Sequence, residues 1–89
     1  MKEQDLEELG FEKITVHEEV IKDDLRIPSF YYYIYQFEDK GSPLDLISPA
    51  SDEVEKGNWK VFIYEAFNVE FTTKKDVKTY IDVIAKNRI

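Results

Sequence analysis

The sequence contains no cysteine and only one histidine among its 89 residues. The absence of cysteine excludes disulfide bonds and thiolate metal sites and is typical of proteins in a reducing compartment, so we expect a cytoplasmic protein. Three glycines are too few for a phosphate-cradling loop, and neither the P-loop pattern nor the GxGxxG dinucleotide-binding pattern occurs. These absences give no reason to expect a cofactor.

Long hydrophobic runs are also missing. No apolar run approaches the ~20 residues that span a bilayer. The first residues, MKEQDLEELGFEK, are acidic and lack the apolar stretch of a secretion signal. We therefore expect neither a membrane span nor a membrane partner.

Basic side chains are scarce in the first two-thirds of the chain. The formal net charge is −7. Residues 1–28 carry four basic and nine acidic side chains (−5), residues 29–58 two and six (−4), and residues 59–89 six and four (+2). Because binding to phosphates needs clustered Lys and Arg, we expect no direct binding of nucleic acid.

Helices are expected at both ends of the chain. KEQDLEEL (2–9) has acidic residues in its first turns, which suit the helix dipole, and Gly10 follows where a helix end prefers a left-handed glycine. Near the other end, Thr73 is a suitable N-cap, with Asp76 three residues later. The residues after it repeat at i, i+3, i+4 and i+7, which predicts an amphipathic helix with the stripe Val77, Tyr80, Ile81 and Ile84.

Between the helices, apolar and alternating segments predict four or five β-strands. The expected strands cover residues 14–20, 30–37, 44–48, 59–67 and 69–72, with Asn68 in a tight turn and KDDLRIPS (22–29) as a connection. Short connections favour antiparallel neighbours. We predict one α+β domain over residues 1–89: an antiparallel meander sheet of four to five strands, a short N-terminal helix, and a C-terminal helix packed on one face.

The stretch SFYYYIYQF (29–37) is apolar on both faces of its expected strand. Alternate residues point to opposite sides, so Tyr31, Tyr33 and Tyr35 lie opposite Tyr32 and Ile34. KVFIYEAF (60–67) looks similar when Ile63 is aligned with Ile34. The similarity indicates either a repeated hairpin or the general preference of aromatic residues for strands, and we favour the second.

This alignment assigns two walls of the sheet. The wall expected to form the core consists of Phe30, Tyr32, Ile34, Trp59, Val61 and Ile63. The opposite wall is the predicted binding surface and consists of Tyr31, Tyr33, Tyr35, Phe62 and Tyr64. At about 150 Å² per side chain it amounts to roughly 750 Å², more than the largest exposed patch of a typical monomer, about 300–600 Å². The expected cover is the N-terminal helix with Leu6, Leu9 and Phe11, a second copy of the chain, or a different partner.

The residue types used in catalysis form no recognisable pattern. His17 is expected on the wet side of its strand, with no converging partners for a metal or a proton transfer. The four serines are placed at turns or strand ends without a nucleophile-elbow pattern. The neighbouring acids Asp23–Asp24 and Asp52–Glu53 are interpreted as solvated loop charge. We predict no catalytic, cofactor or metal site, and therefore no enzyme.

Three lysines occupy the first turns of the C-terminal helix, where the helix dipole disfavours cations: Lys74, Lys75 and Lys78. They either attract an anionic partner or pair with the acidic part of the same chain, and we favour the internal pairing.

The opening LEELGFEKI (6–14), the strand meander and the capped C-terminal helix resemble the small, uncharacterised proteins of phages and other mobile elements in Gram-positive bacteria. Such proteins are commonly interaction factors, including inhibitors of host defence. The resemblance implies a protein partner and assigns no role to any particular residue.

Two functions follow from these observations. The first is a non-enzymatic protein–protein interaction module, monomeric or dimeric, that uses the tyrosine wall. The alternative is an acidic mimic of nucleic acid that inhibits a DNA-binding protein, as a phage or mobile-element counter-defence factor. The mimic requires one continuous acidic face built from Glu3, Asp5, Glu7, Glu8, Glu12, Glu18 and Glu19. A small enzyme ranks third, because it needs an acid pair in a pocket.

Overall fold

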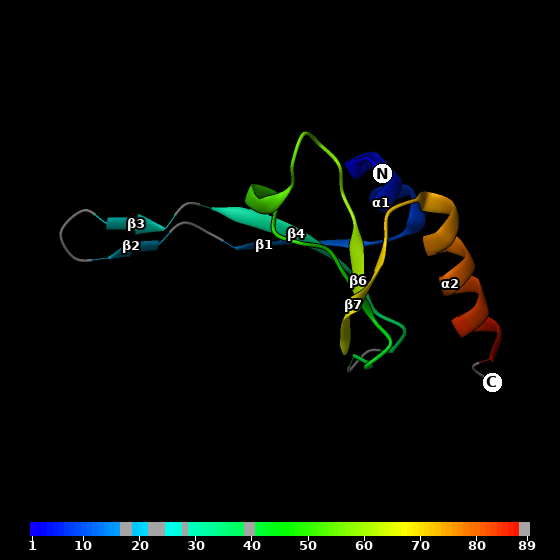
Figure 1. Cartoon of the computed structure of the whole chain (residues 1–89). Coiled ribbons are helices and arrows are strands. Elements are labelled where there is room, and N and C mark those ends of the chain that lie inside the picture. Colours follow the sequence, from blue (N-terminus) through cyan, green and yellow to red (C-terminus); the bar gives the residue numbers. More distant parts are fainter. Residues whose placement is uncertain (17–18, 22–24, 28, 39–40, 88–89) are drawn as a thin grey trace.

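The computed structural model describes residues 1–16, 19–21, 25–27, 29–38 and 41–87 (Figure 1). Their elements, in chain order, are α1 (Glu3–Leu9), β1 (Glu12–Val16), β2 (Glu19–Ile21), β3 (Leu25–Ile27), β4 (Phe30–Tyr35), β5 (Leu46–Ile47), the 3-10 helix η2 (Ser51–Glu53), β6 (Val61–Ile63), β7 (Ala66–Phe71) and α2 (Lys74–Asn87).

Both predicted helices are confirmed, together with their end signals. Gly10 adopts φ +96° after α1, and its N–H donates to the Glu7 carbonyl at 3.1 Å. Phe11 N–H donates to the Leu6 carbonyl at 3.0 Å, so the left-handed glycine satisfies the last turn of the helix. At the start of α2, the Asp76 N–H donates to Thr73 Oγ1 at 3.2 Å, which makes Thr73 the N-cap.

The main sheet has five strands in the order β1-β4-β5-β6-β7, and each neighbouring pair is antiparallel. The predicted α+β class and antiparallel sheet are confirmed. The central strand β5 has only two residues, yet it pairs with β4 on one side and with β6 on the other. Hydrogen bonds beyond β5 support it, because Ser48 N–H donates to the Tyr33 carbonyl at 2.9 Å and Tyr33 N–H donates to Ser48 Oγ at 2.8 Å.

A second, two-stranded sheet interrupts the meander between β1 and β4. Strands β2 and β3 pair with Glu19 opposite Ile27 and Ile21 opposite Leu25. Figure 1 shows this hairpin as an arm that extends away from the body, beyond β1 and β4. The prediction that residues 22–29 form only a connection is therefore wrong for Leu25–Ile27.

The turn between the last two strands lies earlier than the sequence suggested. Residues 64 and 65 join β6 to β7, and Asn68 lies inside β7 rather than in a turn. The Tyr64 N–H donates to the Asp45 carbonyl at 2.7 Å and the Glu65 N–H to the Pro43 carbonyl at 3.2 Å. These bonds hold the turn against the chain that precedes β5, where its backbone groups find partners.

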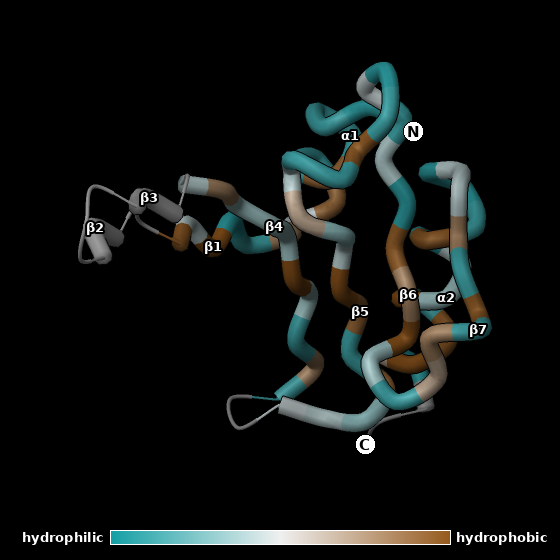
Figure 2. The backbone as a smooth tube through the Cα atoms, turned by 60° about the vertical axis from the view of Figure 1, so that its left-hand side comes forward, coloured by the Kyte–Doolittle hydropathy of each residue, from teal (hydrophilic) through white to brown (hydrophobic). Residues whose placement is uncertain are grey.

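Both helices contribute to one hydrophobic core on one face of the sheet. Its buried members are Leu6 and Phe11 from α1 and the residues after it, Tyr33, Leu46, Trp59 and Val61 from the sheet region, and Val77 and Ile81 from α2. Figure 2 shows the hydrophobic parts of β4, β5 and β6 side by side, with α2 behind the β6–β7 end. Among the described residues, neither α1 nor α2 lies on the other face of the sheet.

Candidate functional site

The tyrosine row of β4 lies under α1 and does not form an outer wall. Tyr33 is fully buried, and its ring meets Trp59 edge-on at 5.4 Å. Tyr31 stacks on the same indole at 5.8 Å, and Tyr35 packs against Phe11 at 5.4 Å. The first of the three expected covers, the N-terminal helix, is the one that the structure contains.

Two carboxylates of α1 bind the hydroxyls of this row. Tyr31 and Tyr33 donate to the two oxygens of Glu3 at 2.7 and 2.6 Å, and Tyr33 also approaches Glu7 at 3.1 Å. Glu3 and Glu7 are four residues apart and so share one side of the helix. The ammonium of Lys13 lies 3.9 Å from Glu3 and 4.0 Å from the centre of the Tyr31 ring. The cluster thus explains how tyrosines fit into the core: their hydroxyls reach charged acceptors at its edge.

This cluster shifts the pKa values of its members. Burial raises the pKa of Glu3, but the hydrogen bonds from Tyr33 and Tyr31 and the charge of Lys13 together hold it below its ordinary value of 4.5. Burial, and then the bonds to Glu3 and Glu7, raise the pKa of Tyr33. The ionised carboxylate and the neutral phenols are therefore the folded forms.

We predict that Glu3→Gln lowers the free energy of unfolding at pH 7 by about 1–2 kcal/mol, because a charge-assisted bond is lost. Since the folded-state pKa of Glu3 is depressed, its contribution is present above the unfolded pKa and is lost as the pH falls through the folded pKa. The difference between wild type and variant should therefore shrink below pH 4.5. Urea unfolding at pH 7, 5 and 3 measures it, with Asp52→Asn as an exposed control; a difference independent of pH contradicts the prediction.

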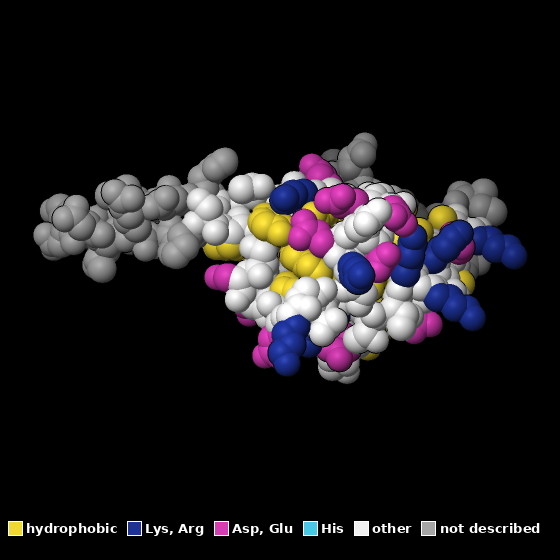
Figure 3. Space-filling view, turned by 90° about the horizontal axis from the view of Figure 1, so that it is seen from above, with side chains coloured by type: hydrophobic (Ala, Val, Ile, Leu, Met, Phe, Trp, Pro, Cys, Tyr) yellow, Lys and Arg dark blue, Asp and Glu magenta, His cyan; other side chains and the backbone are white. Residues whose placement is uncertain are grey.

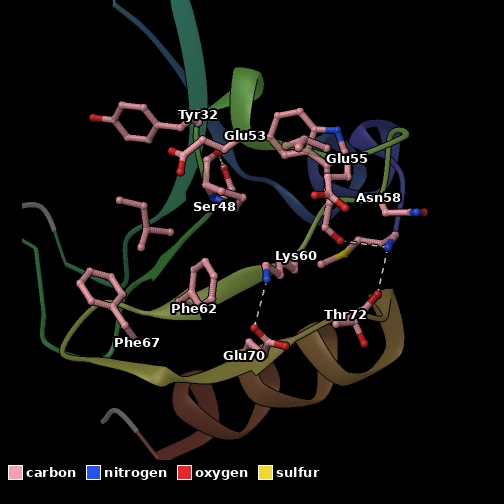
Figure 4. Close-up of a pocket in the computed structure, with 16 residues that line it drawn as sticks. Tyr32, Ser48, Glu53, Glu55, Asn58, Lys60, Phe62, Phe67, Glu70 and Thr72 are labelled. Carbon is pink, nitrogen blue, oxygen red and sulfur yellow. Dashed lines mark hydrogen bonds and ion pairs between the residues drawn. The ribbon is translucent and has the colours of Figure 1, made fainter.

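The opposite face of the sheet carries a second set of aromatic and aliphatic side chains. We call it the aromatic face and define it by Tyr32, Ile34, Ile47, Phe62, Tyr64 and Phe67. These side chains line two neighbouring hollows of about 1090 and 450 Å³, and Tyr32 and Ile47 line both. Figure 4 shows the rings of Tyr32, Phe62 and Phe67 around the larger hollow. Phe67 and Tyr64 remain 64% and 52% exposed, which is unusual for such large apolar groups.

Strand register places these side chains together. Ile34 lies opposite Ile47, and Ile47 lies opposite Phe62, so the three share one face. On β1, Ile14 lies opposite Tyr32, which extends the apolar surface toward that edge. The rings of Phe62 and Tyr64 contact Phe67 at 6.1 and 6.3 Å.

The predicted walls are wrong in the face that they assign to β4. The structure separates Tyr31, Tyr33 and Tyr35, which lie with Val61 and Ile63 at the core, from Phe62 and Tyr64, which lie on the aromatic face. Tyr32 and Ile34, expected in the core, belong to the aromatic face instead. The proposed alignment of Ile34 with Ile63 fails for the same reason, since Ile34 is in register with Phe62 through Ile47.

Several acidic residues required by a nucleic-acid mimic are engaged within the protein. Glu3 and Glu7 accept the tyrosine hydroxyls, Asp5 accepts the Lys2 N–H at 2.9 Å, and Glu8 pairs with Lys74. The internal pairing expected of the α2 lysines is thus present for Lys74. On the side seen in Figure 3, Lys side chains are interspersed with Asp and Glu.

Where the structure describes the remaining sequence candidates, it brings no group of catalytic or metal-binding side chains together. His17, Glu18 and the pair Asp23–Asp24 lie outside the described residues. Ser48 and Ser51 accept backbone N–H groups of β4. Within the described ranges, no three side chains of His, Cys, Asp or Glu are grouped as metal ligands. No helix in the same part of the chain has the length and apolarity to cross a membrane.

The sequence signals for the aromatic face were only partial. The sequence pattern predicts Phe62 and Tyr64 as binding residues, whereas it places Ile47 and Phe67 in strands without assigning them to this face. Comparisons with protein-family models, with curated proteins and with solved structures found no match for this chain.

Proposed function

We propose that this chain is a non-enzymatic protein-binding module and that its aromatic face contacts the partner. The observation that carries the proposal is the placement of both helices on one face of the sheet, which leaves large aromatic side chains on the other. Monomeric proteins rarely expose large contiguous apolar patches, and such patches commonly mark interaction sites.

The chemistry of the face supports binding rather than catalysis. Its members are Tyr, Phe and Ile side chains on a five-stranded sheet, a rigid support that orders few groups on binding. Tyr and Phe are enriched at the centres of interfaces because each buries a large area with little loss of conformational freedom.

The test is affinity capture from cells with wild type and two variants, each quantified by mass spectrometry. Phe67→Ser should keep the fold, because the side chain is 64% exposed, and should reduce capture of the specific partner at least tenfold. Val83→Ser, which removes a half-exposed side chain of α2, is the matched control and should capture the partner like wild type. Equal recovery of the same proteins by all three would contradict the proposal.

A further inference from the structure

The rim of the aromatic face is acidic. The charged side chains that line its two hollows are Asp45, Glu53, Glu55, Glu65 and Glu70, with Lys60 and the α-amino group of Met1 as the cations. Both cations already have partners: Met1 donates to the carbonyls of Trp59 and Thr72 at 3.0 and 2.9 Å, and Lys60 lies 3.4 Å from Glu70. Asp45 is likewise occupied, since it accepts the N–H groups of Phe37 and Ser42. Glu53, Glu55 and Glu65 have no charged or hydrogen-bonding partner for their carboxylates in the part of the chain that the structure describes, and these are the rim charges left for a ligand.

The ammonium of Lys60 already lies on this face between an aromatic ring and a carboxylate, the arrangement that we expect for a cation of a ligand. The Lys60 ammonium lies 5.4 Å from the centre of the Phe62 ring while it pairs with Glu70, and Figure 4 shows this ion pair at the edge of the larger hollow. A cation held between an aromatic ring and a carboxylate is attracted by both. Tyr64 and Glu65 offer the same combination at the smaller hollow, and Tyr32 with Glu53 at the larger one.

We infer that the partner presents a basic segment, with Arg or Lys side chains over the rings and their charges toward the acidic rim. This inference rests on the proposed function and specifies the occupant of the same face. Arginine suits it best, because a guanidinium stacks on aromatic rings and pairs with carboxylates at the same time. A second copy of the chain is disfavoured, since a two-fold contact through this face sets the same carboxylates against each other on subunits of net charge −7.

The probe is a fluorescent decapeptide of alternating Arg and Leu, compared with its Lys and Glu counterparts by anisotropy at 50 and 500 mM NaCl. We expect the Arg peptide to bind at least tenfold more tightly than the Glu peptide and to weaken markedly at high salt. The triple variant Glu53→Gln, Glu55→Gln, Glu65→Gln should lose about tenfold in affinity. Asp82→Asn, which removes an exposed carboxylate of α2, is the control and should leave the affinity for the Arg peptide unchanged. Equal affinity for the Arg and Glu peptides, or for wild type and the triple variant, overturns the inference.

The same variants separate failure of the inference from failure of the proposed function. If the cellular partner is lost with Phe67→Ser but kept by the triple variant, the face binds protein and the basic-segment inference is wrong. If neither variant changes capture, the proposed function fails as well. Sedimentation of the purified protein tests whether a second copy of the chain covers the face. If wild type is a dimer and Phe67→Ser is a monomer, a second copy binds there and the inference is overturned.

Discussion

Tyr33→Ala should lower the free energy of unfolding by about 4 kcal/mol, near the middle of the range for truncating a buried aromatic side chain. Tyr33 is fully buried in the strand next to the centre of the sheet. Its removal opens a cavity beside Trp59 and leaves Glu7 without its phenol donor. A domain of this length has a total stability of roughly 4–13 kcal/mol, so the loss is a large fraction of the total.

Urea unfolding followed by far-UV circular dichroism and by the fluorescence of Trp59, the one tryptophan in the sequence, measures this loss. Tyr33→Phe is the matched control, because it keeps the ring and removes only the hydroxyl bonded to Glu3 and Glu7. It should cost about 1–2 kcal/mol. A loss below about 1 kcal/mol for Tyr33→Ala would mean that the ring is not in the core.

Leu46→Ala should lower the free energy of unfolding by about 3 kcal/mol, as is usual for a fully buried leucine. Leu46 is 0% exposed and forms half of β5, the two-residue strand that joins β4 to β6. A cavity there weakens the contact between the two halves of the sheet as well as the core below it.

Leu44→Ala is the control for Leu46→Ala. Leu44 lies two residues before Leu46, and its side chain is 45% exposed. Its carbonyl accepts the Tyr80 hydroxyl and its N–H donates to Ser42 Oγ, and these backbone groups are unchanged by the substitution. It should cost less than about 1 kcal/mol. Equal losses for the two variants would show that β5 does not hold its leucine in the core.

The helices were predictable because each has a strong local signal. The left-handed Gly10 and the Thr73 cap act within one turn of the chain, and the structure shows the expected bonds at both. The class of the sheet was predictable for a similar reason, since short connections leave little choice other than antiparallel pairing.

The face of β4 was not predictable from its own residues, because FYYYIY is apolar on both sides. The alignment of Ile34 with Ile63 predicts the wrong face for β4, because a shift of one residue moves every side chain to the other face. The true register depends on β5, whose two residues connect Ile34 to Phe62. The face of β4 that packs on the core is therefore set by contacts between strands far apart in the sequence, and the local pattern does not contain this information.

The β2–β3 hairpin was predicted only in part, because residues 19–20 are expected at the end of a single strand over 14–20 and residues 25–27 in a connection. Its strands have three residues each and are flanked by charged residues and by Pro28 in the sequence, all of which are typical of a connection. A ribbon of this length has too little apolar periodicity to be distinguished from a loop.

Tyr33 faces the helices and Tyr32 faces outward, and this orientation of β4 is tested by measuring Tyr32→Ala beside Tyr33→Ala in the same urea titration. Both substitutions replace a tyrosine by alanine, at consecutive positions of β4. They differ in the face of the sheet that loses the side chain. The structure predicts that Tyr32→Ala costs at least about 2 kcal/mol less than Tyr33→Ala. A larger loss for Tyr32→Ala, which the sequence pattern alone would predict, would contradict this orientation of β4 and the binding surface that depends on it.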